Sequence, residues 1–217
     1  SQQRAEAAIA AGDFDAEIVP VEVTDRKGNV TLVTRDEHPR VGVTLESLRK
    51  LEPVFEVEGH QGIITAGSAS GITDGGAALV LTSASHAKLL GCRPLARVAG
   101  WASAGVDPKI MGIGPVPAMQ KLFGRLQQSV DDYDLVELNE AFAAQVLAVL
   151  RDMPIARDRL NVNGGAIALG HPIGCTGARI VVTLLHELQR RNATRGLATL
   201  CVSGGMGMAM ALERGQT

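Results

Sequence analysis

Aromatic side chains are scarce in this 217-residue chain, at 3% of the residues. No stretch approaches the ~20 uninterrupted apolar residues that a membrane-spanning helix needs, and no charged-then-apolar secretory leader is visible. Hydrophobic residues nonetheless make up 46% of the chain, and glycine and alanine are abundant. We therefore expect a soluble globular protein whose backbones pack closely, and no association with a membrane.

The chain also lacks an excess of positive charge. The formal net charge is −2, and there is no basic cluster beyond pairs such as Arg190-Arg191. Because nucleic-acid binding depends on neutralising phosphates with clustered Lys and Arg, the sequence gives no electrostatic case for a nucleic-acid partner.

Cysteine is sparse and its spacing is uninformative for disulfides or metals. Cys92, Cys175 and Cys201 are odd in number and far apart, which is typical of reduced thiols in an intracellular, cytoplasmic protein. No Cys-x-x-Cys or His/Cys pairing indicates zinc, so we expect no metal site. Gly112-Ile-Gly114-Pro lacks the third glycine of a dinucleotide fingerprint, and no phosphate-binding loop sequence occurs.

The pattern of apolar residues and turn residues predicts an α/β fold. Strands alternate with helices, and the last two strands are expected to form a hairpin, which gives mixed pairing in the sheet. The predicted helices are Ser1–Ala11, Leu45–Leu51, Ser83–Leu90, Ala118–Gln128, Glu140–Arg151 and a helix after Thr176. The predicted strands are Ile18–Val23, Val30–Thr34, a buried strand at Ala77–Leu81, then Leu95–Ser103, Tyr133–Leu138, Leu197–Val202 and Met208–Glu213.

Glycine is concentrated around one histidine. Five glycines surround His171 within 14 residues: Gly164, Gly165, Gly170, Gly174 and Gly177. Because Pro172 restricts the backbone of His171, the imidazole has few directions available. Thr176 stands where the next helix would be capped, and a helix N-terminus disfavours imidazolium, so a neutral, proton-accepting His171 is expected. A glycine-rich turn whose histidine only satisfies backbone groups is the alternative.

Three longer motifs lie in the second half of the chain. Residues 161–174 read Asn-Val-Asn-Gly-Gly-Ala-Ile-Ala-Leu-Gly-His-Pro-Ile-Gly. Residues 136–145 read Val-Glu-Leu-Asn-Glu-Ala-Phe-Ala-Ala-Gln, and residues 201–207 read Cys-Val-Ser-Gly-Gly-Met-Gly. All three resemble signatures of the thiolase family, the acetyl-CoA acetyltransferases and 3-ketoacyl-CoA thiolases, and they stand in the family's order.

The resemblance covers the chain but matches roughly the C-terminal half of the family. It implies a layered αβαβα fold, to which residues 1–72 contribute the end of the loop domain that covers coenzyme A. Residues 73–94 would be the tail of the N-terminal core domain, and residues 95–217 the C-terminal thiolase domain. The cysteine that the family acylates aligns with none of the three here, so this chain alone is expected to be inactive.

The resemblance also implies roles for individual residues. His171 would be the base that activates the nucleophile, and Cys201 the acid/base that exchanges the α-proton. Asn139 would hold a water that lines an oxyanion hole, and the backbone of Ser203 would help to bind an oxyanion. Ser70 would contact the pantetheine arm of coenzyme A. Acyl-CoA is thus the expected substrate, with no tightly bound cofactor.

Plainer interpretations of these residues stay open. Cys201 could be an inert buried thiol, Asn139 could cap the following helix, and Ser70 could serve turn geometry. Cys175, near a helix N-terminus, could have a lowered pKa, although packing is its expected role. Ser203 replaces a family glycine, which puts the geometry of its loop in question.

Two functions remain as hypotheses. The first is an acyl-CoA C-acyltransferase of fatty-acid metabolism that cleaves 3-ketoacyl-CoA or condenses acetyl-CoA, with the nucleophile supplied by the family's N-terminal half on the same or a separate chain. The second is a non-catalytic module that binds coenzyme A or a partner subunit. The resemblance further implies a homodimer or homotetramer. The joint presence of His171, Cys201 and Asn139 favours the enzyme.

Overall fold

A four-stranded mixed sheet from the second half of the chain forms the centre of the protein. The computed structural model describes residues 1–57 and 59–215. Its central strands lie in the order β5 (Arg97–Gly105), β8 (Met206–Glu213), β7 (Arg195–Val202) and β6 (Leu135–Leu138). β6 and β7 run parallel, whereas β8 is antiparallel to both of its neighbours. The predicted α/β class and the terminal hairpin are confirmed.

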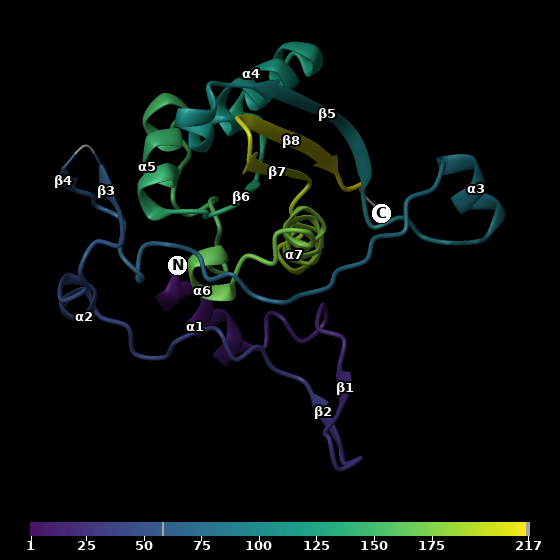
Figure 1. Cartoon of the computed structure of the whole chain (residues 1–217). Coiled ribbons are helices and arrows are strands. Elements are labelled where there is room, and N and C mark those ends of the chain that lie inside the picture. The colour runs from purple at the N-terminus through teal and green to yellow at the C-terminus, as the bar shows by residue number, and fades with distance from the viewer. Residues whose placement is uncertain (58, 216–217) are drawn as a thin grey trace.

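Helices cover both faces of this sheet (Figure 1). α4 (Pro115–Leu126) and α5 (Ala143–Asp152) lie on one face, and α7 (Thr176–Arg190) lies on the other. Because side chains alternate along a strand, Val136 and Leu138 of β6 pack in the α4 and α5 core, while Leu135 packs against α7. Their full burial contributes about 1.5–3 kcal/mol per large apolar side chain.

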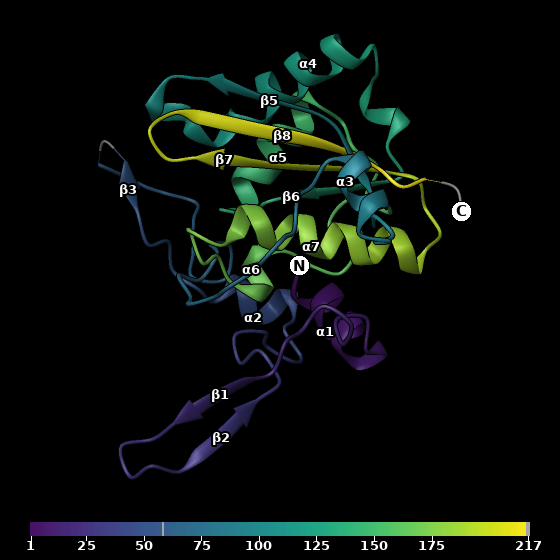
Figure 2. The same cartoon turned by 90° about the vertical axis from the view of Figure 1, so that its right-hand side faces the viewer.

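α7 reads in sequence as an amphipathic helix, and it packs as one. Ile180, Leu184 and Leu188 recur every fourth residue and are almost fully buried against the sheet. A second layer beneath α7 is formed by α1 (Gln2–Ala11) and the short helix α6 (Ala166–Leu169), as Figure 2 shows. The helix at residues 1–11 was predicted, whereas α6 was not.

Within this second layer, α1 packs against the loop before α6 through its small residues. Ala5 and Ala8 are buried, and a Cβ placed on Gly164 would lie 2.9 Å from the Cβ of Ala5. The guanidinium of Arg4 donates to the carbonyl of Arg157 at 2.7 Å and also to that of Leu160. The first helix therefore buttresses the loop that leads into α6.

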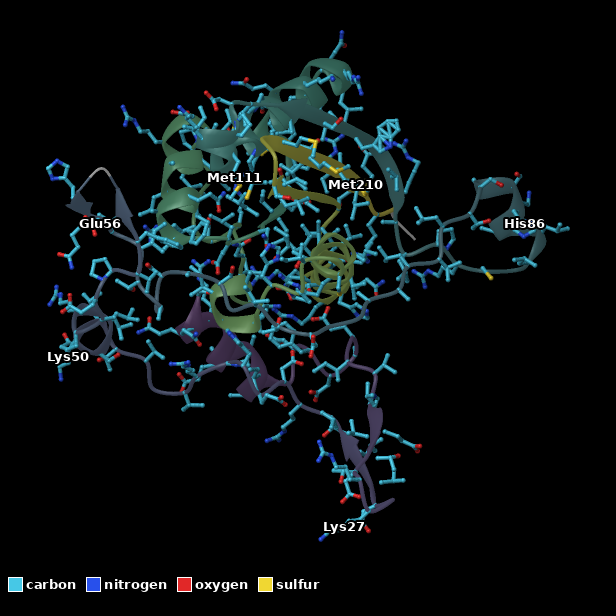
Figure 3. The ribbon with its side chains drawn as sticks, viewed as in Figure 1. Lys27, Lys50, Glu56, His86, Met111 and Met210 are labelled. Atoms are coloured by element: carbon cyan, nitrogen blue, oxygen red, sulfur yellow. The ribbon has the colours of Figure 1, made fainter. Side chains whose placement is uncertain are left out.

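Three segments project from this body. The hairpin of β1 (Val21–Thr24) and β2 (Val30–Val33) extends away from α1, with Lys27 at its tip (Figures 1 and 3). A second hairpin pairs β3 (Glu56–Val57) with β4 (His60–Gln61) after the short helix α2 (Leu45–Arg49). α3 (Ala84–Leu89) sits on an arm of its own. As predicted, the side chain of Ser83 caps α3 by accepting from the backbone of His86 at 3.2 Å.

The buried strand predicted at Ala77–Leu81 is wrong. This segment is assigned no regular secondary structure and pairs with no strand in the described part of the chain, and Val80 and Leu81 are 97% and 73% exposed. Only Leu79 packs against the α7 core. An apolar run predicts burial, but it does not say whether the covering surface lies within the same chain.

The surface of the protein is large for its mass. The accessible area is 13,216 Å², whereas a compact monomer of 22.7 kDa has about 9,500 Å². Part of the excess is apolar: Trp101 is 58% exposed, and Met206 and Met208 are also exposed. Trp101 and Met208 alternate with the buried Ala102 and Ala209, so they lie on the face of the sheet opposite to α4.

No helix among the described residues is both long and apolar enough to cross a membrane.

Candidate active site

His171 lies in the loop between α6 and α7 and is held from three directions. Its backbone N–H donates to the carbonyl of Gly71 at 2.8 Å. Its Nδ1 lies 2.6 Å from Oγ1 of Thr176, and that hydroxyl also lies 3.0 Å from the carbonyl of Pro172. The imidazole is half-buried. Both its backbone and its ring orientation are therefore fixed by neighbours.

These contacts favour one tautomer of His171. The Pro172 carbonyl can only accept, and the hydroxyl of Thr176 lies in position to donate its single proton to it. In this arrangement Oγ1 accepts from His171, and the ring proton is on Nδ1. Nε2 is left with its lone pair and can accept a proton. The histidine is thus oriented as a base through Nε2.

The charge state of His171 agrees with that orientation. Burial, and next to it the positive charge of Arg179, lower the pKa of His171 below its ordinary value. The neutral form was expected from the helix N-terminus alone. Thr176, however, is the first residue of α7 and not its cap, because Cys175 holds the cap position without a side-chain bond. The hydroxyl of Thr176 serves the imidazole instead.

Ser70 and Gly71 join His171 to the loop after β6. The backbone N–H and the hydroxyl of Ser70 both donate to the carbonyl of Ala141, at 3.0 and 3.1 Å. Ala69 and Phe142 form an isolated antiparallel bridge beside this contact. The hydroxyl of Ser70 keeps its acceptor lone pairs for another group.

Asn139 follows β6 and is almost completely buried. Its backbone N–H donates to the carbonyl of Thr199 in β7 at 2.9 Å. The alternative role as a helix cap is wrong, because α5 begins at Ala143 with Phe142 in the cap position. Neither Nδ2 nor Oδ1 of Asn139 has a hydrogen-bond partner among the described residues. A buried amide without partners costs free energy, which favours a bound water or ligand at this place.

Cys201 lies at the end of β7, two residues beyond the contact of Thr199 with Asn139. It pairs with Gly207 of β8 and is buried, and this burial raises the pKa of its thiol. The thiol is therefore protonated at rest. It stands at the carboxyl end of a parallel strand pair, where α/β proteins usually bind ligands.

The turn after Cys201 accommodates a serine without strain. Gly204 and Gly205 adopt left-handed backbone conformations in this turn, with φ of 85° and 88°, whereas Ser203 does not. The turn is also held from outside, because Val106 donates its N–H to the carbonyl of Gly205 at 2.8 Å. The backbone of Ser203 is thus outside the left-handed region, so its Cβ causes no backbone strain there.

The other two cysteines are placed differently. Cys175 is buried, as its expected packing role requires, and burial raises the pKa of its thiol despite the nearby charge of Arg179, so the alternative of a lowered pKa is wrong. Cys92 is exposed in the connector after α3.

Two groups of buried polar side chains were missed by the sequence reasoning. Burial raises the pKa of Glu137 to about 8 and that of Glu17 to about 7. Both amide atoms of Gln145, in the first turn of α5, are buried without a partner among the described residues. Glu137 and Gln145 stood inside a matched motif, but nothing in their spacing indicated burial.

No group of three His, Cys, Asp or Glu side chains that could hold a metal occurs in the described ranges 1–57 and 59–215. A surface hollow of about 450 Å³ is lined by residues of the β3–β4 hairpin such as Pro53, Phe55 and Gln61. None of the predicted site residues lines it.

The fold and the site together define a layered α/β protein in which a buried amide and a buried thiol follow the carboxyl ends of β6 and β7. Its neutral histidine lies in a glycine-rich loop that is tied through Gly71 and Ser70 to the loop after β6. This chain belongs to the thiolase family. The family model "Thiolase, C-terminal domain" matches residues 92–214, and "Thiolase, N-terminal domain" matches residues 1–85. The expectation that only the family's C-terminal half would match is therefore wrong, because both domain models match.

Curated relatives are similar over nearly the whole chain. The chain is 54% identical over 214 residues to the acetyl-CoA acetyltransferase of Cupriavidus necator and covers 54% of that protein. It is 56% identical over 216 residues to the beta-ketoadipyl-CoA thiolase of Pseudomonas aeruginosa and covers 53% of it. In both matches 99% of this chain is aligned. The chain thus spans about half the length of the curated relatives it matches.

Solved structures agree with this assignment. The acetyl-CoA acetyltransferase of Bacillus anthracis superposes with a TM-score of 0.94 at 50% identity, covering 99% of this chain and 53% of that one. Human mitochondrial 3-ketoacyl-CoA thiolase in complex with CoA gives a TM-score of 0.87 at 42% identity, covering 99% and 52%. The predicted thiolase-like fold is confirmed. The division at residues 72 and 94 stays a prediction.

Proposed function

We propose that this chain carries out acyl transfer between CoA thioesters as part of a thiolase. The reaction is the thiolytic cleavage of a 3-ketoacyl-CoA, or its reverse, the condensation of two acetyl-CoA molecules, through an acyl group held on a cysteine. The names of the relatives support CoA thioesters as the substrate class, since they mention acetyl-CoA and beta-ketoadipyl-CoA.

The orientation of His171 is the observation that carries the proposal. A cysteine becomes an effective nucleophile when a neighbouring base removes its proton. The bond from Nδ1 to Thr176 leaves Nε2 unprotonated, and burial keeps the ring neutral. We assign to Nε2 the removal of the proton from the nucleophilic thiol. When acetyl-CoA acylates that thiol, the same proton then passes to the sulfur of the departing CoA.

Cys201 supplies the second proton transfer. In cleavage, its buried thiol donates a proton to the α-carbon of the departing acetyl-CoA, and in condensation its thiolate removes that proton. A pKa raised by burial suits the donor role. The unpartnered amide of Asn139 would hold a water that, with His171, stabilises an oxyanion. The backbone N–H of Ser203 would serve a second oxyanion.

We assign Ser70 to the pantetheine arm of the substrate. Its loop joins the His171 loop through Gly71 and the Asn139 loop through Ala141. A ligand bound along residues 68–71 would therefore lie beside both. Acyl-CoA is a substrate here, and the proposal includes no tightly bound cofactor.

The nucleophile is proposed to come from protein outside residues 1–217. Burial raises the pKa of both Cys175 and Cys201, so neither has the properties of an activated thiolate, and Cys92 is exposed on a connector after α3. The open sheet face around Trp101 and the exposed Val80 and Leu81 are apolar surfaces that further protein would cover. A homodimer or homotetramer is the expected assembly.

Intact-mass spectrometry after incubation with acetyl-CoA tests the proposal. The chain alone should form no stoichiometric thioester. A fusion in which the part of the Cupriavidus necator enzyme left uncovered by the match precedes Ser1 should acquire one hydroxylamine-labile acetyl group on a cysteine outside this chain. Full acetylation of Cys92, Cys175 or Cys201 in the chain alone, with turnover, would contradict it.

Variants of the fusion separate the assigned roles. His171→Ala should slow acyl-enzyme formation by ~10²–10⁴-fold, the usual contribution of a general base. Cys201→Ser should spare acylation by acetyl-CoA and depress condensation more strongly. His86→Ala is the matched control, because His86 lies on α3, far from the sheet (Figure 3). Equal losses in both half-reactions for Cys201→Ser would refute the assignment of that thiol.

A further inference from the structure

A second histidine, His38, contacts the loops that hold His171. It lies in the segment between β2 and α2, where residues 34–42 are exposed except for the half-buried His38 and Pro39. The same segment is tied to α1, because Arg40 donates its N–H to Oε1 of Gln2 at 3.0 Å. His38 is thus the inward-facing residue of a strap that crosses the layer beneath α7.

The hydrogen bond of His38 fixes its tautomer. Nδ1 lies 2.8 Å from the carbonyl oxygen of Ala168, and a carbonyl can only accept. The proton is therefore on Nδ1. Ala168 belongs to α6, which ends two residues before His171, so this bond anchors the chain leading directly into the histidine loop.

The opposite side of the His38 ring rests on Gly71. A Cβ placed on Gly71 would lie 2.0 Å from Nε2 of His38, so no other residue fits at position 71 while the ring keeps its place. Gly71 in turn accepts the backbone hydrogen bond of His171 at 2.8 Å. His38 therefore touches both chain segments that determine where the backbone of His171 lies.

We propose that His38 is a positioning residue for His171, which holds α6 and the Ser70–Gly71 loop at the separation that aims the catalytic imidazole. The proposal deepens the proposed function and rests on it. His38 itself does not touch the reacting atoms; it acts through Ala168 and Gly71.

The expected effect on catalysis exceeds the effect on stability. Loss of one neutral hydrogen bond changes the folding equilibrium by only about 2- to 13-fold, whereas a displacement of ~1 Å at a catalytic group can cost ~10²-fold in rate. A residue that only stabilised the fold would change the melting temperature and leave the rate of the folded protein unchanged.

Two substitutions in the fusion described above distinguish these cases. His38→Phe keeps a ring on Gly71 but has no donor for Ala168, and His38→Asn restores a donor close to the place of Nδ1. We expect His38→Phe to lower the acylation rate constant by about 10- to 100-fold with half-saturation by acetyl-CoA changed less than threefold. His38→Asn should recover most of the rate. His86→Phe, on the exposed α3, should match the unsubstituted protein.

Three results would contradict the positioning role of His38. An unchanged rate in His38→Phe, an effect confined to half-saturation, or a His38→Asn variant as slow as His38→Phe would each overturn the positioning role. If the unsubstituted fusion forms no acyl-enzyme at all, the proposed function fails, and the contact itself is decided by a second measurement.

That measurement is nitrogen-15 NMR of the fusion with labelled histidine, in which the 5 histidines of the chain are assigned by single substitutions. His38 should show its proton on Nδ1. His38→Phe should shift the ring resonances of His171, and His86→Phe should leave them in place. Resonances of His171 that ignore His38→Phe would refute the proposal independently of any activity.

Discussion

Replacing Thr176 by valine tests whether catalysis depends on the tautomer of His171 as well as on the presence of its imidazole. The side chain of Thr176 is buried and nearly isosteric with valine, so the change removes little besides the hydroxyl. That hydroxyl accepts the Nδ1 proton of His171 across 2.6 Å. Without it, the ring can carry its proton on either nitrogen, and the form with a free Nε2 becomes less populated.

The size of the effect follows from the bond that is lost. A neutral hydrogen bond has a net worth of about 0.5–1.5 kcal/mol, which corresponds to a factor of roughly 2–13 in the ratio of the competent tautomer to the other one. The acylation rate should fall by up to about that factor. This is well short of the ~10²–10⁴-fold loss expected when the base itself is removed.

The assay is the burst of acyl-enzyme with acetyl-CoA, measured by rapid quench on the fusion. Thr176→Ser should retain most of the rate because it keeps the acceptor. Thr183→Val is the matched control: Thr183 is equally buried on α7, but its hydroxyl donates to Glu17 at 3.2 Å and not to His171. A burst rate unchanged in Thr176→Val would refute the tautomer argument. A loss as deep as that of His171→Ala, at an unchanged melting temperature, would also refute it.

Two further predictions concern stability. Burial raises the pKa of Glu137 from 4.5 to about 8. Between these two pH values the folded state keeps a proton on Glu137 that the unfolded state has released. The free energy of unfolding therefore falls as pH rises, by up to about 1.4 kcal/mol per pH unit. Glu137→Gln should flatten this slope in urea titrations from pH 5 to 8; an unaltered slope contradicts the burial argument. Gly207→Ala should destabilise the protein by more than about 2 kcal/mol, because its Cβ would lie 2.0 Å from the carbonyl oxygen of Gly114. Gly124→Ala, in the interior of α4 with open space around it, should instead stabilise by about 0.5–1 kcal/mol, and thermal melts showing the same sign for both would refute the contact.

Much of the fold was predictable because local signals and packing agree. The spacing of Ile180, Leu184 and Leu188 predicted α7, and Ser83 predicted the start of α3. The three motifs located the candidate site residues before any geometry was known. Sequence patterns succeed in such places because one side chain serves both local structure and the core.

The failures occurred where the role of a side chain is not set by the helix or strand beside which it stands. Thr176 and Asn139 both looked like helix caps, yet Thr176 bonds to an imidazole five residues earlier and Asn139 makes no side-chain bond within the described residues. His38 carried no local signal at all, because its partner Ala168 lies 130 residues away. The run at residues 77–81 failed for a related reason, since its apolar side chains lack a partner strand in the described structure.

The order of strands in the sheet has a consequence for how this protein forms during synthesis. β5 is the first strand of the sheet to leave the ribosome, but its neighbour is β8, and the side chains of Arg97 and Glu213 that meet across this pair are 116 residues apart. Chain closure over such a distance costs entropy before any contact repays it, so the β7–β8 hairpin should form first and then recruit β5. Until the β7–β8 hairpin has formed, β5, which carries Trp101, has no neighbouring strand with which to pair. The last eight-residue strand, once released, therefore completes the sheet in the middle and not at its border.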